Sequence, residues 1–496
     1  MPISLKHPSA SKLKDHELFR TKAFIDGKWV SANDGAKVAV IDPATGKEIG
    51  TVPEMGVEET RAAISAASRA LVDWRKTTCN ERYDILIEWA QLISRHKEDL
   101  ALLLTMENGK PLNQSISEIE YAQSFAQWFA EEAKRIYGEV IQSPLRNQRF
   151  MMIKQPVGVC SMVTPWNFPS AMITRKMGAA LAAGCTVVLK PAAETPYSAL
   201  ALCELATRAG IPKGVVNIVT TDKHVAEVGL EMCTNDLVRK VSFTGSTNVG
   251  KLILKQCADG VKRVSLELGG NAPYIVFDDA DLESAVEGIM TAKIINAGQV
   301  CTAPNRIYVQ SGIYDRFSER LAERMRTLHI GSGLEEGVHV GPVITERART
   351  KVHRHVEDAV TRGARVMVGG AEHRPAEGFF IKPTLISDLT DDALVANEET
   401  FGPLVAMRRF TTEEEVADLA NRTKYGLAGY VFTRDVGRVF RMSESIEAGM
   451  ICVNSGQLLA SEAMPFGGIK ESGIGREGSK HGIEEYVDEK LIAIGF

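Results

Sequence analysis

The chain has 496 residues, of which 44% are hydrophobic and 24% are charged, a balance typical of a globular protein with two or three domains. Its 58 basic and 63 acidic side chains give a formal net charge of −5, so the surface should attract neither nucleic acid nor an anionic membrane. No apolar run reaches the roughly 18 residues that a membrane helix requires. The composition also excludes collagen-like, disordered and disulfide-stapled classes.

The N-terminus, up to Lys14, carries three lysines and three serines but no acidic residue. A mitochondrial transit peptide would be rich in arginine, yet the first arginine is Arg20. We therefore expect a disordered tail over residues 1–20 and a cytoplasmic protein, with a mitochondrial location less favoured. The eight cysteines form no CxxC pair, which is typical of a reduced compartment and argues against a zinc ribbon.

The first quarter of the chain predicts a small β meander followed by helices. Within residues 22–55, Asp26 and Gly27 lie between apolar flanks and indicate a type I′ hairpin. Residues 58–136 show apolar spacing near 3.6. We expect one helix over 58–76 and a longer one over 82–109 that Gly109 ends.

From residue 157 to 277, strand and helix patterns alternate. The strand segments are rich in valine and isoleucine, which is typical of a parallel sheet covered on both faces; they are VGVCSMVTP, CTVVLKP, GVVNIVT, KVSFTG, RVSLELG and APYIVFD. One helix between them has Thr195 as its N-cap, Pro196 at its first position and Gly210 at its end. The pattern predicts a doubly wound α/β region.

A second α/β region is expected over residues 269–473, with strands such as RIYVQ and AGYVFT. Two stretches fit neither region: residues 138–156 and the C-terminal EYVDEKLIAIGF. Both are interpreted as exposed strands with unpaired edges, and such edges usually find a partner strand. An oligomer built by strand addition would satisfy both.

Two glycine motifs could mark a phosphate site. Residues 473–478 match GxGxxG, but no apolar strand precedes them and only 18 residues follow, so a plain turn is the better interpretation. Residues 245–250, GSTNVG, follow the strand KVSFT and open a helix. That arrangement would direct backbone N–H groups and the positive end of a helix at an anion, with a plain turn as the alternative.

Three residues are candidates for chemistry. Cys301 follows a flexible Asn-Ala-Gly-Gln turn, where a thiolate can be exposed and stabilised by backbone donors, although a structural cysteine is the alternative. Glu267 ends an apolar strand, and burial would raise its pKa as a general base requires, unless it only pairs with a lysine. The amide of Asn167 could donate to an oxyanion or simply belong to a turn.

Five motifs, PWNFP, LELGG, GQVC, EETFGP and PFGG, follow one another in this order between residues 165 and 468. With them the chain resembles the NAD(P)-dependent aldehyde dehydrogenase superfamily over essentially its whole length. PWNFPSAMITRK and SFTGSTNVGK resemble more narrowly the succinate-semialdehyde dehydrogenase branch. This match makes purely structural roles for Cys301, Glu267 and Asn167 much less favoured.

The resemblance implies an α/β fold of three parts. A Rossmann-type cofactor domain would comprise residues 1–137 and 157–268. A second α/β domain, the catalytic one, would comprise 269–473. A small β oligomerisation arm would comprise 138–156 and 474–496, and would join the chain into a homo-oligomer, a dimer or a tetramer.

The resemblance also implies a mechanism. The thiolate of Cys301 would attack the aldehyde carbon, and the oxyanion would be held by the Asn167 amide and the Cys301 N–H. Hydride transfer to NAD(P)+ would give a thioester, and Glu267 would activate the water that hydrolyses it to an acid. The substrate would be a small aldehyde, a semialdehyde such as succinic semialdehyde.

A set of cofactor-binding residues follows from the same resemblance: Pro165, Trp166, Lys190, Ala193, Phe243, Gly245, Ser246, Leu268, Glu399 and Phe401. NAD-selective relatives often carry a glutamate three residues after the ribose-binding lysine, and here that position is Ala193. A carboxylate there would repel a 2′-phosphate, so we expect that NADP is preferred or that both cofactors are accepted. The alternative is that Glu194 restores the preference for NAD.

On the substrate side, the resemblance assigns Phe466 to the mouth of the site, with core packing as the alternative. Arg175 is the candidate anchor for an anionic substrate, unless it pairs with a protein carboxylate such as Glu462. Ile295 stands where many succinate-semialdehyde enzymes have a second arginine, and Ala303 where they have a second cysteine. We therefore expect a raised KM for succinic semialdehyde and broader use of neutral aldehydes.

Other functions are less well supported. A dehydrogenase for neutral aldehydes with a different physiological substrate remains open. A CoA-acylating relative would typically lack Glu267, and a non-catalytic relative would lack part of the catalytic set. No metal is expected: His353 and His355 are the only close pair of histidines, and their spacing fits a solvated helix face better than one ion.

Overall fold

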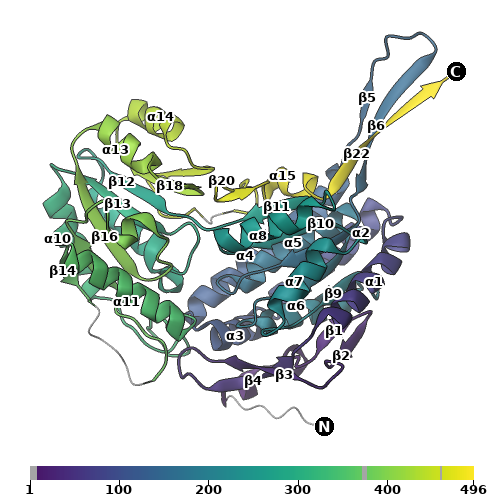
Figure 1. Cartoon of the computed structure of the whole chain (residues 1–496), viewed down its shortest axis with the longest axis horizontal. Coiled ribbons are helices and arrows are strands. Elements are labelled where there is room, and N and C mark those ends of the chain that lie inside the picture. The colour runs from purple at the N-terminus through teal and green to yellow at the C-terminus, as the bar shows by residue number, and fades with distance from the viewer. Residues whose placement is uncertain (1–7, 371–376, 459–460) are drawn as a thin grey trace.

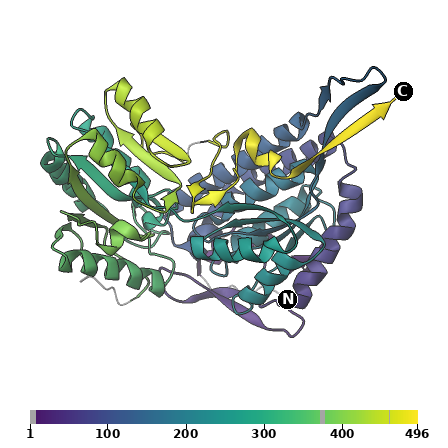
Figure 2. The ribbon, with the colours of Figure 1, turned by 45° about the horizontal axis from the view of Figure 1, so that its top comes forward.

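The computed structural model describes residues 8–370, 377–458 and 461–496. Two α/β lobes, each built on its own sheet, lie side by side, and a narrow arm projects from one of them (Figure 1). The C-terminus lies at the tip of the arm in both views (Figures 1 and 2). Within the described ranges, no helix is both long and apolar enough to cross a membrane.

The N-terminal segment from Pro8 onward is ordered, and the prediction of a tail is wrong for it. It forms two 3₁₀ turns, η1 (Pro8–Lys12) and η2 (His16–Leu18). Ala10 and Leu18 are fully buried in the core of the first lobe. The carboxylate of Asp99 accepts hydrogen bonds from the backbone N–H groups of Lys14 and Asp15, and these bonds anchor the N-terminal segment. Residues 1–7 lie outside the described part of the chain.

The first lobe contains an eight-stranded sheet in the order β2-β1-β9-β8-β7-β10-β11-β21. Its strands are β1 (Ala23–Ile25), β2 (Lys28–Val30), β7 (Val159–Val163), β8 (Thr186–Lys190), β9 (Val216–Ile218), β10 (Val238–Thr244), β11 (Arg263–Glu267) and β21 (Gly473–Ile474). The five central strands, β9 to β11 in the sheet, are parallel, which confirms the predicted buried parallel sheet.

The predicted hairpin is present between β1 and β2. Asp26 and Gly27 have φ values of 50° and 76°, as a type I′ turn requires at both central positions. The remaining strands of the meander, β3 (Lys37–Ile41) and β4 (Glu48–Pro53), form a separate two-stranded sheet.

The helical region over 58–136 contains four helices. They are α1 (Val57–Trp74), α2 (Cys79–Arg95), α3 (Lys97–Asn108) and α4 (Leu112–Glu132), followed by the short turn η3 (Ala133–Arg135). The helix expected over 82–109 is therefore two helices, because the backbone of His96 leaves the helical region between them. Gly109 ends α3 with a φ of 88°, as predicted.

The other helices of the first lobe are α5 (Pro169–Ala183), α6 (Pro196–Arg208), α7 (Val225–Thr234), α8 (Thr247–Ala258) and α15 (Ser479–Glu484). Pro196 begins α6 as expected, and Gly210 follows its C-cap with a φ of 96°. Thr195 makes no side-chain cap, which corrects its predicted role. The buried carboxylate of Glu107 accepts the N–H groups of Tyr197 and Ser198 instead, each at 2.8 Å.

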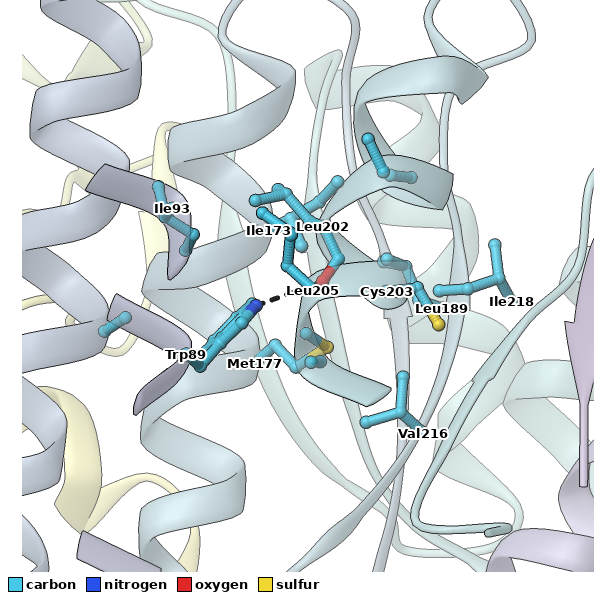
Figure 3. Packing of buried hydrophobic residues seen from close by; sticks show 14 of the residues in the cluster. Trp89, Ile93, Ile173, Met177, Leu189, Leu202, Cys203, Leu205, Val216 and Ile218 are labelled. Atoms are coloured by element: carbon cyan, nitrogen blue, oxygen red, sulfur yellow. Dashed lines mark hydrogen bonds between the residues drawn. The ribbon is translucent and has the colours of Figure 1, made fainter. Parts of the chain in front are cut away.

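The core of this lobe lies between its helices and the sheet (Figure 3). Trp89 of α2, Met177 of α5 and Leu202 of α6 converge there, beside Leu189 of β8. The indole Nε1 of Trp89 donates to the carbonyl oxygen of Leu202 at 3.0 Å. Burying an indole without that acceptor would be costly, so the bond fixes how α2 meets α6.

The second lobe contains a seven-stranded sheet in the order β14-β15-β16-β13-β12-β18-β19, parallel except for β14. Its strands are β12 (Ala272–Val276), β13 (Pro304–Gln310), β14 (Arg365–Val368), β15 (Thr384–Ser387), β16 (Leu404–Phe410), β18 (Ala428–Phe432) and β19 (Met450–Val453). The strand APYIVFD, grouped above with the first α/β region, thus belongs to the second sheet.

The helices of this lobe are α9 (Leu282–Ile289), α10 (Tyr314–Arg326), α11 (Glu346–Thr361), α12 (Leu394–Asn397), α13 (Glu413–Asn421) and α14 (Val436–Ser445). A π turn, η4 (Met290–Ile294), and a 3₁₀ turn, η5 (Ile295–Gly298), follow α9, and β17 (Tyr425–Gly426) pairs with β20 (Ile469–Lys470). His353 and His355 of α11 are buried, so the solvated helix face was wrong. His355 Nδ1 lies 3.0 Å from the Thr400 hydroxyl.

The arm consists of β5 (Glu139–Ile141), β6 (Gln148–Pro156) and β22 (Val487–Gly495). The two stretches predicted to have unpaired edges pair with each other: β22 runs antiparallel to β6 along its whole length. The segment between Ile474 and β22, which was expected in the arm, lies elsewhere. There β21 joins the first sheet, and α15 packs against α4 and α5.

Candidate active site

The order of the strands in the first sheet marks a ligand site. From β7 the chain moves outward through β8 and β9, and then returns to β10 on the other side of β7. Ligands of open α/β sheets bind at such a switch point, outside the carboxyl ends of the strands. Trp166 follows β7, Ser246 follows β10 and Glu267 ends β11, so all three lie at this edge.

A cavity of about 230 Å³ opens at this edge, between the two lobes. Its lining is Pro165, Trp166, Asn167, Met172, Thr244, Gly245, Ser246, Leu268, Gly269, Cys301, Lys351, Glu399 and Phe401. Most of the predicted catalytic and cofactor residues therefore meet in one place. Met172, Thr244, Gly269 and Lys351 were missed; the first three lie near predicted motifs in the sequence, whereas nothing in the sequence pointed to Lys351.

The second lobe contributes residues that precede its strands. Cys301 comes just before β13, while Glu399 and Phe401 come just before β16. The two lobes thus face each other with the carboxyl edge of one sheet and the amino edge of the other.

The turn before Cys301 is held rigidly, which corrects the expectation of a flexible one. Asn296, Ala297 and Gly298 have φ values of 49°, 52° and 74°, and the left-handed region is costly for the first two. The side chain of Asn296 donates to the carbonyl oxygen of Asn167 at 2.9 Å, and that of Gln299 donates to the Asn296 carbonyl oxygen at 3.0 Å. These bonds hold the thiol-bearing residue in one place.

The side chain of Asn167 is held by a hydrogen bond to the same turn. Its Nδ2 donates to the carbonyl oxygen of Gln299 at 3.1 Å, which uses one of the two amide hydrogens. The second hydrogen is available to an oxyanion in the cavity that Asn167 lines.

A buried ion pair between Lys110 and Glu118 supports the segment PWNFP. The Lys110 ammonium donates to the carbonyl oxygen of Asn167 at 2.7 Å and to the carboxylate of Glu118 at 2.5 Å. The other oxygen of Glu118 accepts the N–H of Ser170 at the start of α5 at 2.9 Å. Asn108 also donates to the Trp166 carbonyl oxygen at 2.8 Å. The segment PWNFP is therefore anchored by α3 and α4.

Cys301 is partly exposed, in contrast to the cysteines buried in the first lobe. Burial raises the pKa of its thiol to about 12, and the negative charges of Glu399 and Glu267 act in the same direction. The guanidinium of Arg175 opposes them. Arg175 is thus the side chain whose charge favours the thiolate, the form in which a cysteine is reactive.

Glu267 is buried behind the cavity, and neither of its carboxylate oxygens has a hydrogen-bond partner among the described residues. Burial raises the pKa of Glu267 well above its usual range, and the neighbouring Glu477 raises it further. Its backbone oxygen accepts the N–H of Gly245 at 3.0 Å, which ties β11 to the glycine turn. A buried carboxyl without partners is the pattern of a group kept for a reacting water.

The glycine turn fits a dinucleotide cofactor. A Cβ on Gly245 would lie 2.4 Å from the ring of Phe243, so the turn has room only for backbone. Phe243 thus lies under the turn and does not line the cavity. Ser246 caps the twelve-residue helix α8, whose free N–H groups suit a pyrophosphate. By contrast, the motif at 473–478 lies in β21 and the turn after it, against β11.

The part of the cavity that Glu399 and Phe401 line is also preformed. Oε1 of Glu399 accepts the N–H of Gly270 at 2.9 Å. Phe401, with a φ of 58°, meets the ring of Trp166 edge to face at 5.5 Å. A bound NAD(P)+ would supply the hydride acceptor, and Glu399, Phe401 and Trp166 are residues that would hold it.

Lys190 and Ala193 lie apart from the main cavity. The Lys190 ammonium donates to the carbonyl oxygen of Pro191 at 2.9 Å. Burial lowers the pKa of Lys190, and the carboxylates of Glu194 and Asp222 oppose that shift. Ala193 shares a second cavity of about 250 Å³ with the same two acidic residues.

The three predicted substrate residues do not line the main cavity. Arg175 is buried, and its Nε donates to the carboxylate of Glu477 at 2.6 Å, so its protein partner is not Glu462. Its guanidinium lies 4.2 Å from the ring of the buried Phe466. One nitrogen, Nη1, has no hydrogen-bond partner in the described structure. Ile295 packs against the apolar residues around Cys301.

Comparisons with known proteins agree with this geometry. Residues 29–492 match the aldehyde dehydrogenase family. Over 484 residues the chain is 54% identical to the succinate-semialdehyde dehydrogenase GabD of Escherichia coli K12, whose name specifies NADP(+), covering 98% of this chain and 100% of that one. It is 55% identical over 483 residues to the glutarate-semialdehyde dehydrogenase of Pseudomonas putida, with 97% and 99% covered.

A solved structure shows the same fold. The crystal structure of an NADP-dependent enzyme from Escherichia coli superimposes with a TM-score of 0.96 at 54% identity, covering 98% of this chain and all of that one (100%). The fold of this chain, with its two lobes and its arm, is thus a known architecture. The chain belongs to the aldehyde dehydrogenase family, as an NAD(P)-dependent enzyme similar to succinate-semialdehyde dehydrogenase.

Proposed function

We propose that the protein oxidises an aldehyde with a carboxylate at its far end, succinic or glutaric semialdehyde, to the dicarboxylic acid. The observation that carries this proposal is Arg175, a buried cation one helical turn from Met172 of the cavity wall. Its Nη1 lacks a partner, and a buried donor left unsatisfied is costly unless a ligand completes it. The names of the two relatives, which act on C4 and C5 semialdehydes, support the same class.

The residues support a two-stage reaction. The Cys301 sulfur forms a bond to the aldehyde carbon, and the carbonyl oxygen becomes an oxyanion facing the free amide hydrogen of Asn167 and the Cys301 N–H. A bound NAD(P)+ would supply the acceptor for the hydride that leaves this carbon, and loss of that hydride would restore the C=O bond as a thioester of Cys301. Glu267 then takes a proton from water, the water oxygen attacks the thioester carbon, and the Cys301 thiolate leaves.

In this proposal the first lobe holds the cofactor, and the second lobe supplies the nucleophile Cys301. Both cofactors are accepted and NADP is preferred, because Ala193 presents no carboxylate to a 2′-phosphate. The acidic neighbours Glu194 and Asp222 limit that preference. Ala193→Glu should lower kcat/KM with NADP about tenfold and leave NAD nearly unchanged, because the added carboxylate would repel the 2′-phosphate that only NADP carries. Preference for NAD by more than about a hundredfold in the unmodified protein would contradict this assignment.

The test of the substrate class is kcat/KM for succinic semialdehyde, glutaric semialdehyde and butanal with both cofactors. We expect a semialdehyde to be used at least about tenfold better than butanal, since one charge-assisted contact is worth that much. Equal or better use of butanal would favour the second candidate, a neutral-aldehyde dehydrogenase. Ile295, an apolar side chain beside Cys301, is the observation that favours it.

We also propose that the chain forms a homo-oligomer through its arm. Leu491 and Phe496 of the arm are 62% and 71% exposed, and Val140 on β5 is 79% exposed. Within the described residues, β22 and β5 each have one edge without a strand. Sedimentation equilibrium should show a dimer or tetramer that Leu491→Asp weakens. Val436→Asp, at a residue 71% exposed on α14, is the matched control. A monomer at micromolar concentration would overturn the proposal.

A further inference from the structure

Tyr121 of α4 lies on the apolar wall beside the nucleophile. It packs against a compact cluster that we call the tail wall, made of Ala122, Phe168, Ala171, Met172, Val300 and Ala303. Val300 precedes Cys301 in the chain, and Met172 lines the cavity with it. Ile295 packs against the same cluster. Tyr121 and Ile295 therefore border the wall through which Met172 reaches the cavity.

The hydroxyl of Tyr121 is the polar feature of this wall. Burial raises its pKa, and the positive charge of Arg175 opposes that shift. Arg175 contacts the same wall, since its Nη2 lies 3.1 Å from the sulfur of Met172. The charges of Glu462 and of the Cys301 sulfur also act on it. Its ring is held by Phe125, edge to face at 4.6 Å. The guanidinium of Arg175 lies 5.8 Å from the same Phe125 ring, so Tyr121 and Arg175 meet the same two side chains, Phe125 and Met172.

The chemistry of the two groups leaves both ready for an anion. A guanidinium has only donors, so Arg175 can use at most the oxygen of the phenol and leaves its proton for another acceptor. Arg175 itself keeps Nη1 without a partner, while Nε is taken by Glu477. Two donors, one charged and one neutral, are therefore available near each other on an otherwise apolar wall.

We propose that Tyr121 is a specificity-determining residue: its hydroxyl donates a hydrogen bond to the anionic end of the substrate, beside the charge of Arg175. This rests on the proposed semialdehyde function. Ile295 offers no donor, so the phenol supplies the second contact. A neutral donor holds a carboxylate less tightly than a second arginine would, and it admits neutral chains at a smaller penalty.

The experiment compares Tyr121→Phe with the unmodified protein on succinic semialdehyde and on butanal, which has the same number of carbons. We expect kcat/KM for succinic semialdehyde to fall at least about fivefold, mainly through KM, as the loss of one hydrogen bond predicts. Butanal should change less than about twofold. Tyr137→Phe, at a tyrosine 69% exposed outside the site, is the matched control and should change neither.

A second variant separates substrate contact from packing. In Tyr121→Phe the KM for succinic semialdehyde should be raised. Adding Ile295→Arg in that background should lower it most of the way back, because the arginine supplies a donor from the same wall. Equal losses on both aldehydes, or no loss on either, would overturn the role of Tyr121 while leaving the semialdehyde function in place. Failure of the unmodified protein to use either semialdehyde would overturn both.

Discussion

The two sides of the cavity are built differently. On the chemical side, Asn167 and the turn before Cys301 are fixed by hydrogen bonds among themselves and by the buried Lys110. On the side of the tail wall, apolar packing dominates, and Arg175 and Tyr121 bring the polar groups. The first arrangement does not depend on the substrate, whereas the second changes with single side chains. The reaction is therefore more strongly determined than the choice of aldehyde.

The chemical side should fail completely when its nucleophile is removed. Cys301→Ala should lower kcat by more than about a thousandfold on every aldehyde, because no group replaces the covalent step. Cofactor binding, followed by fluorescence titration, should persist. Cys301→Ser should be nearly as inactive, since a serine hydroxyl ionises far less readily. Residual activity above a few per cent would assign the role to another cysteine.

Glu267 should give the chemical side its pH dependence. It acts as a base only when ionised, and its raised pKa means that it ionises at a higher pH than an ordinary carboxylic acid. The steady-state rate should therefore increase with pH through the ionisation of Glu267, and Glu267→Gln should be slow and lack that increase, so that only the ionisation of the Cys301 thiol contributes at higher pH. The check is a pH–rate profile of both proteins; the same slope in both would contradict the assignment.

The buried support of the chemical side should couple stability to activity. Lys110→Met removes the partner of the buried Glu118 and should reduce the free energy of unfolding by about 3–5 kcal/mol. It also releases the Asn167 carbonyl, so kcat should fall on semialdehyde and butanal alike. Urea unfolding and steady-state kinetics measure the two effects. A loss confined to one class of aldehyde would show that Lys110 affects substrate choice and does not support the chemical side.

The tail wall should show the smaller and more selective effect. Arg175→Ala should lower kcat/KM for succinic semialdehyde at least about tenfold, as one charge-assisted contact predicts. Propanal and butanal should lose less, through the raised pKa of Cys301 alone. Equal losses on charged and neutral aldehydes would show that the ion pair with Glu477 is the whole role of Arg175.

The sequence was informative where the determining interactions are local. The glycine turn, the hairpin at Asp26 and the proline start of α6 depend on the backbone preferences of one or two residues. The motifs around Cys301, Glu267 and Asn167 were recognised for the same reason, and the structure brings them to one edge. Their chemical roles remain predictions.

What the sequence could not supply are contacts between distant segments. Arg175 and Glu477 are 302 positions apart, and nothing near either residue indicates the other. The N-terminal segment looked like a tail because the groups that anchor it, such as Asp99 and Arg208, lie far along the chain. Tyr121 was not singled out, because the sequence alone indicates only a packing role for a tyrosine on an amphipathic helix. Its neighbours are known only from the structure.

The central claim is that Cys301 forms a thioester with a semialdehyde which Glu267 then releases. The most direct measurement is mass spectrometry of Glu267→Gln after mixing with succinic semialdehyde and NADP+. The account predicts one succinyl group per chain on the peptide that contains Cys301, together with about one equivalent of reduced cofactor. An unmodified Cys301, or acylation of another cysteine, would contradict it.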